Sequence, residues 1–505
     1  MKVLLNKEFV FRLEILNSFP RGNNMVMSIS DFTNKLSKDR RTIIKNLKSL
    51  VNDSKQLECE KYISIVLNDD NTLTVTVAQD FDINYFLLYY LEKSILFNLC
   101  LEIYNSTFFD LHSFATKYFY SYSTVYRQTK KLNQILQQYN LSLDLKTSNS
   151  IVGKEQNIRF FYFTLFWESY KVLKWPFEEI EFNKLKEVIE KSDEELKTFL
   201  AKPNMVIIWL AVTLSRIDKG YFITEEYEFN EPAFPMLSKE QFYSLFFGFS
   251  KDFQILLTLD DEAWHYEANF LYFSLITSQI YPLKQISTLK LTAFSGLKIN
   301  TATLITEKWI ERFMAELEIA LDVNEYFYLY YNLLSLHSRY LYLPGPVETV
   351  PCFTNMSYGK IDLFIEYKLI LSFLDTLFSV PIIEPLYAQK DALCTFYLLF
   401  ISELMKSKRP ALNIALYSHS SVFQKEFFEE MLIKNLSFPV TFLPYTSNKV
   451  DFLITDVSLT RWLKKDIPTF VWDSTIDQEK INRLTTYLDT IYTQRYKMKI
   501  RYSHT

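Results

Sequence analysis

The spacing of apolar residues between 111 and 167 predicts two short helices, a tight turn and a hairpin. The helices are expected within LHSFATKYFY and STVYRQTKKLNQILQQY, joined by Ser-Tyr-Ser. In the second helix, Val125, Leu132, Ile135 and Leu136 recur at the spacing of one buried face. Two alternating segments then surround a Thr-Ser-Asn turn in LSLDLKTSNSIVGKEQNIRFF. This order is typical of a winged helix-turn-helix, whose second helix enters the DNA major groove.

The outward side of that second helix supplies the candidate DNA contacts. Ser121 or Ser123 is expected to cap the helix, because a serine oxygen at this position accepts a hydrogen bond from an unpaired backbone amide. The side chains expected to contact DNA are Ser123, Thr124, Tyr126, Arg127, Lys130 and Lys131. The alternative interpretation of this stretch is an ordinary helical hairpin with a solvated basic face.

A second arrangement of the same kind precedes the first. Residues 1–24 predict one amphipathic helix, with Phe9, Leu13 and Leu16 at helical spacing and a break at Pro20-Arg21-Gly22. A further helix is expected from Ile29 to Leu36. With the helix and the hairpin described next, this front stretch repeats the order helix, helix, hairpin. Two such units in succession favour DNA binding more than either unit alone.

The helix within KDRRTIIKNLKSLV is expected to be the recognition helix of this front unit, with Ser37 as its N-cap. Arg41, Lys45 and Lys48 fall at i, i+4 and i+7 on the side opposite the apolar residues, so they are candidate DNA contacts. The segment YISIVLNDDNTLTVTVA then predicts a hairpin that turns at residues 68–71.

Charge is distributed unevenly along the chain. The net charge is −4, but residues 1–160 carry 20 basic and 16 acidic side chains, whereas the remaining 345 carry 35 and 43. Within 111–160 the numbers are 7 and 2. Nucleic-acid affinity depends on local neutralisation of phosphates rather than on total charge, so this basic front permits DNA binding.

The strings SYSTVYRQTKKLN and GKEQNIRFFYFTLFW resemble the helix-turn-helix of the Mga family, the global and virulence transcription regulators of Gram-positive bacteria. The likeness extends over nearly the whole chain and is strongest between about Phe81 and Trp167. It implies a DNA-binding transcription regulator, which we expect to be an activator that links the state of the sugar phosphotransferase system to gene expression. The partners it implies are double-stranded DNA and the phosphocarrier protein of that system.

From Phe160 to about Lys406 the pattern is almost continuously helical and very aromatic. Two comparable halves, at about 168–286 and 287–406, each hold about five helices and suggest a duplicated module. In the Mga family this region resembles the phosphotransferase-system regulatory domains, which are helical bundles whose histidines are phosphorylated by the sugar-uptake relay.

The histidine positions of those modules are only partly retained. Trp209 occupies the first slot, in WLAVTLSRIDKG, and Ser274 occupies the second, in EANFLYFS. His265 lies two residues before Glu267 and is a candidate substitute. His337, in YYNLLSLHSRYLYLPG, stands where the family has a histidine. The resemblance makes His337 and His265 phosphorylation candidates, whereas a histidine among leucines is otherwise a packed core residue.

The last hundred residues change character, because strands alternate with helices from ALNIALYS onward. This order predicts a small doubly wound α/β domain. It resembles the enzyme IIB component of the phosphotransferase system, whose phosphorylated cysteine follows the first strand. That loop is here Ser-His-Ser-Ser at 418–421, without a cysteine. We therefore expect an interaction surface that helps to hold a homodimer rather than an active transferase.

The totals exclude several classes of function. The four cysteines form no CxxC pair, and no glycine-rich phosphate loop or zinc motif is present among only 7 glycines. We expect no enzyme activity, cofactor or metal. No window approaches 18 uncharged apolar residues, and the N-terminus does not resemble a signal peptide, so a soluble cytoplasmic protein without a membrane partner is expected.

The sequence thus predicts a multidomain, mainly α protein. A long helix over residues 84–106 is expected to join the two winged units. The expected domains are an N-terminal helix with the first winged helix-turn-helix, a linker helix with the second, two helical regulatory domains and an enzyme IIB-like α/β domain, at 1–80, 81–165, 166–286, 287–406 and 407–505. The alternative function is that of a phosphotransfer or scaffold protein of the sugar-uptake relay that does not bind DNA.

Overall fold

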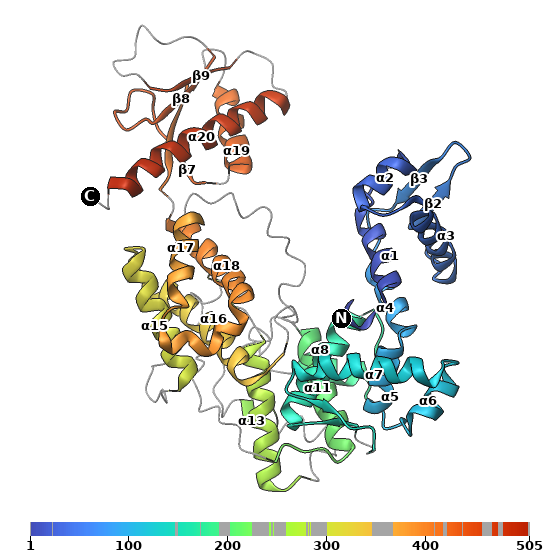
Figure 1. Ribbon diagram of the computed structural model, residues 1–505. Helices are drawn as coiled ribbons and strands as arrows, with labels where there is room; N and C mark the ends of the chain where they lie inside the picture. Colours follow the sequence, from blue (N-terminus) through green and yellow to red (C-terminus); the bar gives the residue numbers. More distant parts are fainter. Residues whose placement is uncertain are drawn as a thin grey trace. The chain divides into compact units, whose positions relative to one another are not determined.

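The structure is a computed structural model (Figure 1) that divides the chain into two compact units. Unit 1 comprises residues 1–281, 288–307 and 330–354, and unit 2 comprises 282–287, 308–329 and 355–505. The residues described are 2–22, 24–146, 150–171, 173–190, 203–224, 242–243, 246, 259–278, 281, 283, 300–345, 367–408, 410–417, 422–436, 438–456, 467–472 and 478–502.

The first winged helix-turn-helix lies at the start of unit 1, where strand β3 pairs on both sides to give the antiparallel order β1-β3-β2. Burial alternates along β2 and β3, as the period of two in the sequence predicts. The elements are η1 (Lys2–Leu4), α1 (Lys7–Ser18), β1 (Asn24–Ser28), α2 (Ile29–Leu36), α3 (Arg40–Gln56), β2 (Ile63–Leu67) and β3 (Thr72–Val77).

Two local predictions in this unit are wrong. The helix expected over 1–24 ends at Ser18, and the segment after Pro20 becomes strand β1. Ser37 does not cap α3: it closes α2 in the left-handed conformation, at φ 50°, and Asp39 caps α3 by accepting the Thr42 amide at 2.9 Å. An aspartate oxygen satisfies the helix-start amides as well as a serine does.

The linker predicted as one helix over 84–106 consists of two. Helix α4 spans Asn84–Glu92 and helix α5 spans Ile95–Tyr104, with Ser94 extended between them. The Ser94 hydroxyl donates to the Leu4 carbonyl at 2.6 Å. This contact fixes the bend against the N-terminal segment.

The second winged unit has the predicted order of helix, helix, hairpin and helix. The antiparallel pair β4-β5 places Ser142 opposite Val152 and Leu143 opposite Ile151. The predicted Thr-Ser-Asn turn, at 147–149, lies outside the described residues. The elements are α6 (Leu111–Lys117), α7 (Tyr122–Gln137), β4 (Ser142–Leu143), β5 (Ile151–Val152) and α8 (Glu155–Tyr170).

Helix α8 is buried on every face, and only Glu155 and Trp167 are partly exposed. Its neighbours in unit 1 include α4 and α11 (Pro203–Asp218). Such a helix needs apolar residues all round, and FFYFTLF supplies them. The last helix of the second winged unit is therefore also a core helix of the helical region that follows.

Two charged side chains of α8, Glu155 and Arg159, form a network with Arg216 and Glu267. The Arg159 guanidinium contacts both Glu267 oxygens, with its Nη2 at 2.9 Å from Oε1, and its Nε lies 3.0 Å from Glu155. Arg216 of α11 adds two bonds to Glu155, at 2.8 and 2.7 Å. Arg159 and Glu267 are fully buried, so each charge requires the other.

Unit 1 also contains further helices of the predicted regulatory region, and two of these helices continue into unit 2. The further helices are α9 (Phe182–Glu190), α13 (Asp261–Thr277), α15 (Thr301–Glu316) and α16 (Val323–Tyr342), of which α15 and α16 have residues in both units. None of the helices in the described part of the chain combines the length and the apolar character that a membrane span requires.

Unit 2 contains helices and a parallel sheet of order β7-β6-β8-β9, and the order of these elements along the chain confirms the predicted alternation of strands and helices. The elements are α17 (Tyr367–Leu377), η5 (Pro381–Gln389), α18 (Lys390–Lys408), β6 (Leu412–Tyr417), α19 (Val422–Asn435), β7 (Val440–Phe442), β8 (Phe452–Thr455), β9 (Thr469–Val471) and α20 (Gln478–Tyr502).

Among the described residues, the helices of this domain cover one face of the sheet, so the predicted doubly wound layout stays a prediction. Leu412 and Ile414 of β6 share one apolar cluster with Leu432 of α19 and Leu484 of α20, so both helices pack against one face. The opposite face is built from Ala415, Val450 and Leu453, and no helix within the described residues joins that cluster.

We predict that Arg159→Leu lowers the free energy of unfolding of unit 1 by about 3–5 kcal/mol, because Glu267 would remain as an uncompensated buried charge. Calorimetry of the full chain would measure the change. The matched control is Lys174→Leu, which removes a pair with Glu92 whose side chains are 61% and 41% exposed, so the loss should stay below about 1 kcal/mol. Equal losses in the two variants would refute a structural role for the network.

Candidate nucleic-acid interface

The start of helix α7 follows a tight turn after α6. Phe119 is left-handed at φ 57°, and the Tyr120 amide donates to the Ala115 carbonyl at 2.9 Å. Ser121, rather than Ser123, is the N-cap, and its hydroxyl accepts the Thr124 amide at 3.3 Å. The turn therefore begins α7 with its first amides satisfied by a side chain, as one of the two sequence alternatives predicts.

Helix α7 presents the predicted faces. Val125, Leu132, Ile135 and Leu136 are buried, as the periodicity predicts. Thr124 is half-buried, and Lys131 is treated separately below. The remaining predicted contacts are exposed to solvent on the other side of the helix: Ser123, Tyr126, Arg127 and Lys130.

Two exposed tyrosines shape this outward face. Tyr122 and Tyr126 stack with ring centroids 6.3 Å apart, and Lys130 Nζ lies 5.2 Å from the Tyr126 ring centroid. Tyr122 was not among the predicted contacts, although its i, i+4 relation to Tyr126 places both on one side of a helix. The face thus offers cationic groups for phosphates and aromatic groups for base edges.

Lys131 has a different environment from Arg127 and Lys130. Its Nζ donates to the Leu5 carbonyl at 3.3 Å, and partial burial lowers the pKa of the ammonium. Lys131 therefore points toward the N-terminal segment, a placement that helical spacing alone did not predict.

Helix α3 holds the second candidate set. Arg41, Lys45 and Lys48 are all exposed, and Lys45 Nζ lies 3.2 Å from Glu8 of α1. The same Glu8 carboxylate accepts a hydrogen bond from Arg12 at 2.8 Å. The basic side of α3 thus faces solvent, and Lys45 shares the Glu8 carboxylate with Arg12.

A partly buried network fixes α3 from behind. Arg12 of α1 donates to Asp53 of α3 at 2.9 Å and to Asn46 at 3.3 Å, and the Tyr90 hydroxyl of α4 donates to Asp53 at 2.7 Å. Burial and the hydrogen bond to the Asp53 carboxylate raise the pKa of Tyr90, so the phenol keeps its proton. The Asp53 carboxylate thereby links helices α1, α3 and α4.

The histidines predicted as phosphorylation sites lie in contrasting environments. His337 on α16 is fully buried, its Nδ1 is 2.8 Å from the Thr306 hydroxyl of α15, and burial lowers its pKa to about 3. His265 on α13 is half-buried, with its ring centroid 5.5 Å from that of Tyr243. His337 is therefore a neutral imidazole at physiological pH.

The residues at the other two positions where the resemblance implies a histidine, Trp209 and Ser274, are part of the core. Trp209 is fully buried and stacks on Phe163 with centroids 4.0 Å apart, and its indole N–H donates to Ser278 at 3.3 Å. Ser274 is also fully buried. The predicted loop at 418–421 lies outside the described residues. Within the described ranges, no group of histidine, cysteine and acidic side chains could hold a metal ion.

Comparison with known proteins finds a family match for the second winged unit. Residues 79–166, from just before α4 to within α8, match the family model described as the Mga helix-turn-helix domain. This part of the chain is therefore similar to a Mga helix-turn-helix domain. A Streptococcus pneumoniae protein described as a candidate trans-acting regulator is 25% identical over 198 residues. That match covers 38% of this chain and 40% of the relative, so the chain spans well under two thirds of the relative's length.

The resemblance predicted from the α7 region is thus confirmed for the residues that the family model matches. The match covers the second winged unit, whereas the first winged unit lies outside it. Helices α4 and α5, predicted as a linker, fall within the Mga helix-turn-helix domain.

Proposed function

We propose that this Mga-like protein is a DNA-binding transcription regulator whose helix α7 enters the major groove. The observation that carries the proposal is the exposed set of Ser123, Tyr126, Arg127 and Lys130 on a capped helix inside the matched Mga domain. Arg127 and Lys130 would neutralise phosphates, and Tyr126 would reach base edges. Thr124, half-buried at the first turn of α7, would support this contact.

Helix α3 would provide a second contact along the same DNA. Arg41, Lys45 and Lys48 are exposed on it, and the Arg12–Asp53 bond anchors its opposite side. A protein with two winged units on one chain gains affinity at two places, and breaking either contact leaves the other in place. We assign α7 the larger role because it lies within the matched domain.

We predict that Arg127→Ala with Lys130→Ala reduces the slope of log affinity against log salt by about 2, because each phosphate contact contributes about 0.9. Fluorescence anisotropy with a double-stranded DNA fragment from the protein's own upstream region would measure it. The control is Lys186→Ala with Lys434→Ala, two lysines with side chains 54% and 74% exposed outside both winged units, which should leave the slope unchanged.

An unchanged slope in the folded α7 variant would contradict the assignment of α7. Absence of any DNA binding by the parent protein at low salt would instead favour the alternative, a phosphotransfer or scaffold protein of the sugar-uptake relay. The experiment therefore separates a misplaced contact from a wrong function.

Regulation by the sugar phosphotransferase system is the second part of the proposal, with activation as the expected direction. His337 is the candidate acceptor, and a phosphate there carries a charge of about −2 at neutral pH. Since His337 is fully buried against Thr306, α15 and α16 would have to separate locally for a phosphocarrier protein to reach it. Phosphorylation would therefore repack this bundle.

We predict that incubation with the phosphocarrier relay and phosphoenolpyruvate places acid-labile phosphate on His337, as mapped by mass spectrometry. Thr306→Val should increase the labelling, because it removes the hydroxyl 2.8 Å from Nδ1. His337→Asn serves as the unlabelled control. Phosphate on His265 alone, which is half-buried, would assign the switch to that histidine instead. Absence of labelling in both the parent protein and the Thr306→Val variant would refute the link to the relay.

Self-association through residues 408–505 is the third part of the proposal, because operators are commonly bound by symmetric dimers. Ile433, Val471 and Tyr487 are exposed apolar side chains on this domain, 63%, 56% and 42% accessible. A second copy of the chain would cover these side chains on association.

We predict that light scattering of the full chain gives about twice the monomer mass of 60.2 kDa, and that a variant ending at residue 407 gives the monomer mass. Circular dichroism of the shortened variant would verify that its helices remain folded. A dimer that survives the truncation would assign the interface to another part of the chain.

A further inference from the structure

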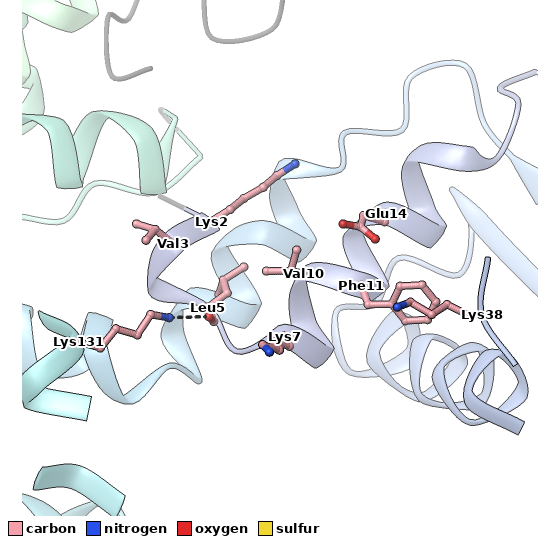
Figure 2. A pocket seen from close by; sticks show the side chains of 9 residues that line it. All are labelled: Lys2, Val3, Leu5, Lys7, Val10, Phe11, Glu14, Lys38 and Lys131. Carbon is pink, nitrogen blue, oxygen red and sulfur yellow. Dashed lines mark hydrogen bonds between the residues drawn. The ribbon is translucent and has the colours of Figure 1, made fainter. Parts of the chain in front are cut away.

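A cavity of about 400 Å³ lies in unit 1 between the N-terminal segment and helix α7 (Figure 2). Its walls come from the N-terminal segment between residues 2 and 14, from Lys38, and from Lys131 of α7. A volume of this size falls within the range of small-molecule sites. The lining residues are Lys2, Val3, Leu5, Lys7, Val10, Phe11, Glu14, Lys38 and Lys131.

The cavity is strongly basic. Its lining includes Lys2, Lys7, Lys38 and Lys131 against a single acidic side chain, Glu14. An ammonium group is a compact donor that binds phosphate as a point charge. An anion with more than one negative charge would be attracted to this basic cavity.

Lys131 is the most buried of the four lysines that line the cavity. Its stem is partly buried, and one of its N–H groups donates to the Leu5 carbonyl at 3.3 Å, as the dashed line in Figure 2 shows. An ammonium has three donors, so two remain for a bound anion. The burial that lowers the Lys131 pKa would be offset by an anion beside it.

One wall of the cavity is apolar. Val3, Leu5, Val10 and Phe11 contribute to it, and Lys38 Nζ lies 5.8 Å from the centroid of the Phe11 ring. Inorganic phosphate would leave this wall uncovered. A phosphate joined to an apolar or aromatic group would contact the lysines and the wall together.

We propose that this cavity binds the phosphate group of an organic phosphate and thereby ties the N-terminal segment of the first winged unit to helix α7 of the second. Lys131 belongs to α7, whereas the other lining residues belong to the first unit, so the ligand would contact both. Occupancy would fix the spacing of α3 and α7. The phosphate can come from a free metabolite or from a DNA backbone, and the experiment distinguishes these sources.

The first arm is independent of the proposed DNA binding. Isothermal titration of the full chain with phenyl phosphate should show binding, and phenol, which lacks the phosphate, should not bind. Lys7→Gln with Lys38→Gln should weaken phenyl phosphate binding by roughly tenfold or more, since two charged contacts are lost. Lys55→Gln with Lys61→Gln, two exposed lysines of the same winged unit outside the cavity, should leave it unchanged.

The second arm measures the salt dependence of DNA binding for the same two variants. Phenyl phosphate binding that depends on Lys7 and Lys38, with an unchanged DNA slope, identifies a free organic phosphate as the ligand. No phenyl phosphate binding, with a slope shallower by about 2 in the Lys7, Lys38 variant alone, identifies a DNA phosphate. If the cavity variant matches the control variant in both arms, the proposal is wrong, whether or not the protein binds DNA.

Discussion

The buried contact between Arg159 and Glu267 is the constraint on which the organisation of unit 1 depends. Neither charge has access to water, so the helices that carry them must meet at this point. Arg159 stands on α8, directly after the wing of the second winged unit, and Glu267 stands on α13 of the helical region. Glu267 also accepts the Ile223 amide at 2.9 Å, which adds a loop to the same carboxylate.

This constraint gives α8 two roles. Its aromatic residues pack within the winged unit through Tyr139 and Phe161, whose centroids are 5.2 Å apart, and within the helical region through Phe163 and Trp209. A rearrangement of the helical region would displace α8, and α8 cannot move without its wing. The winged unit and the helical region therefore share the packing of α8.

Sequence patterns predicted the elements whose burial is one-sided. The buried side of α7, the β2-β3 hairpin and the succession of strands and helices in unit 2 all follow from patterns within one segment. Patterns failed where the decisive partner is distant in sequence. Strand β1 forms because β3 pairs with it, and Lys131 turns aside because Leu5, 126 positions earlier, accepts its hydrogen bond. No local spacing carries that information.

The histidine slots illustrate the same limit from the chemical side. The resemblance identified Glu267 as a motif residue near a missing histidine, whereas the structure gives it the ionic bond to Arg159. Trp209, in the other slot, fills the core beside Phe163. Trp209 and Ser274, which occupy the two histidine slots that the resemblance implies, are both fully buried. His337 keeps the imidazole but encloses it, and a neutral, enclosed imidazole responds only when the surrounding helices open.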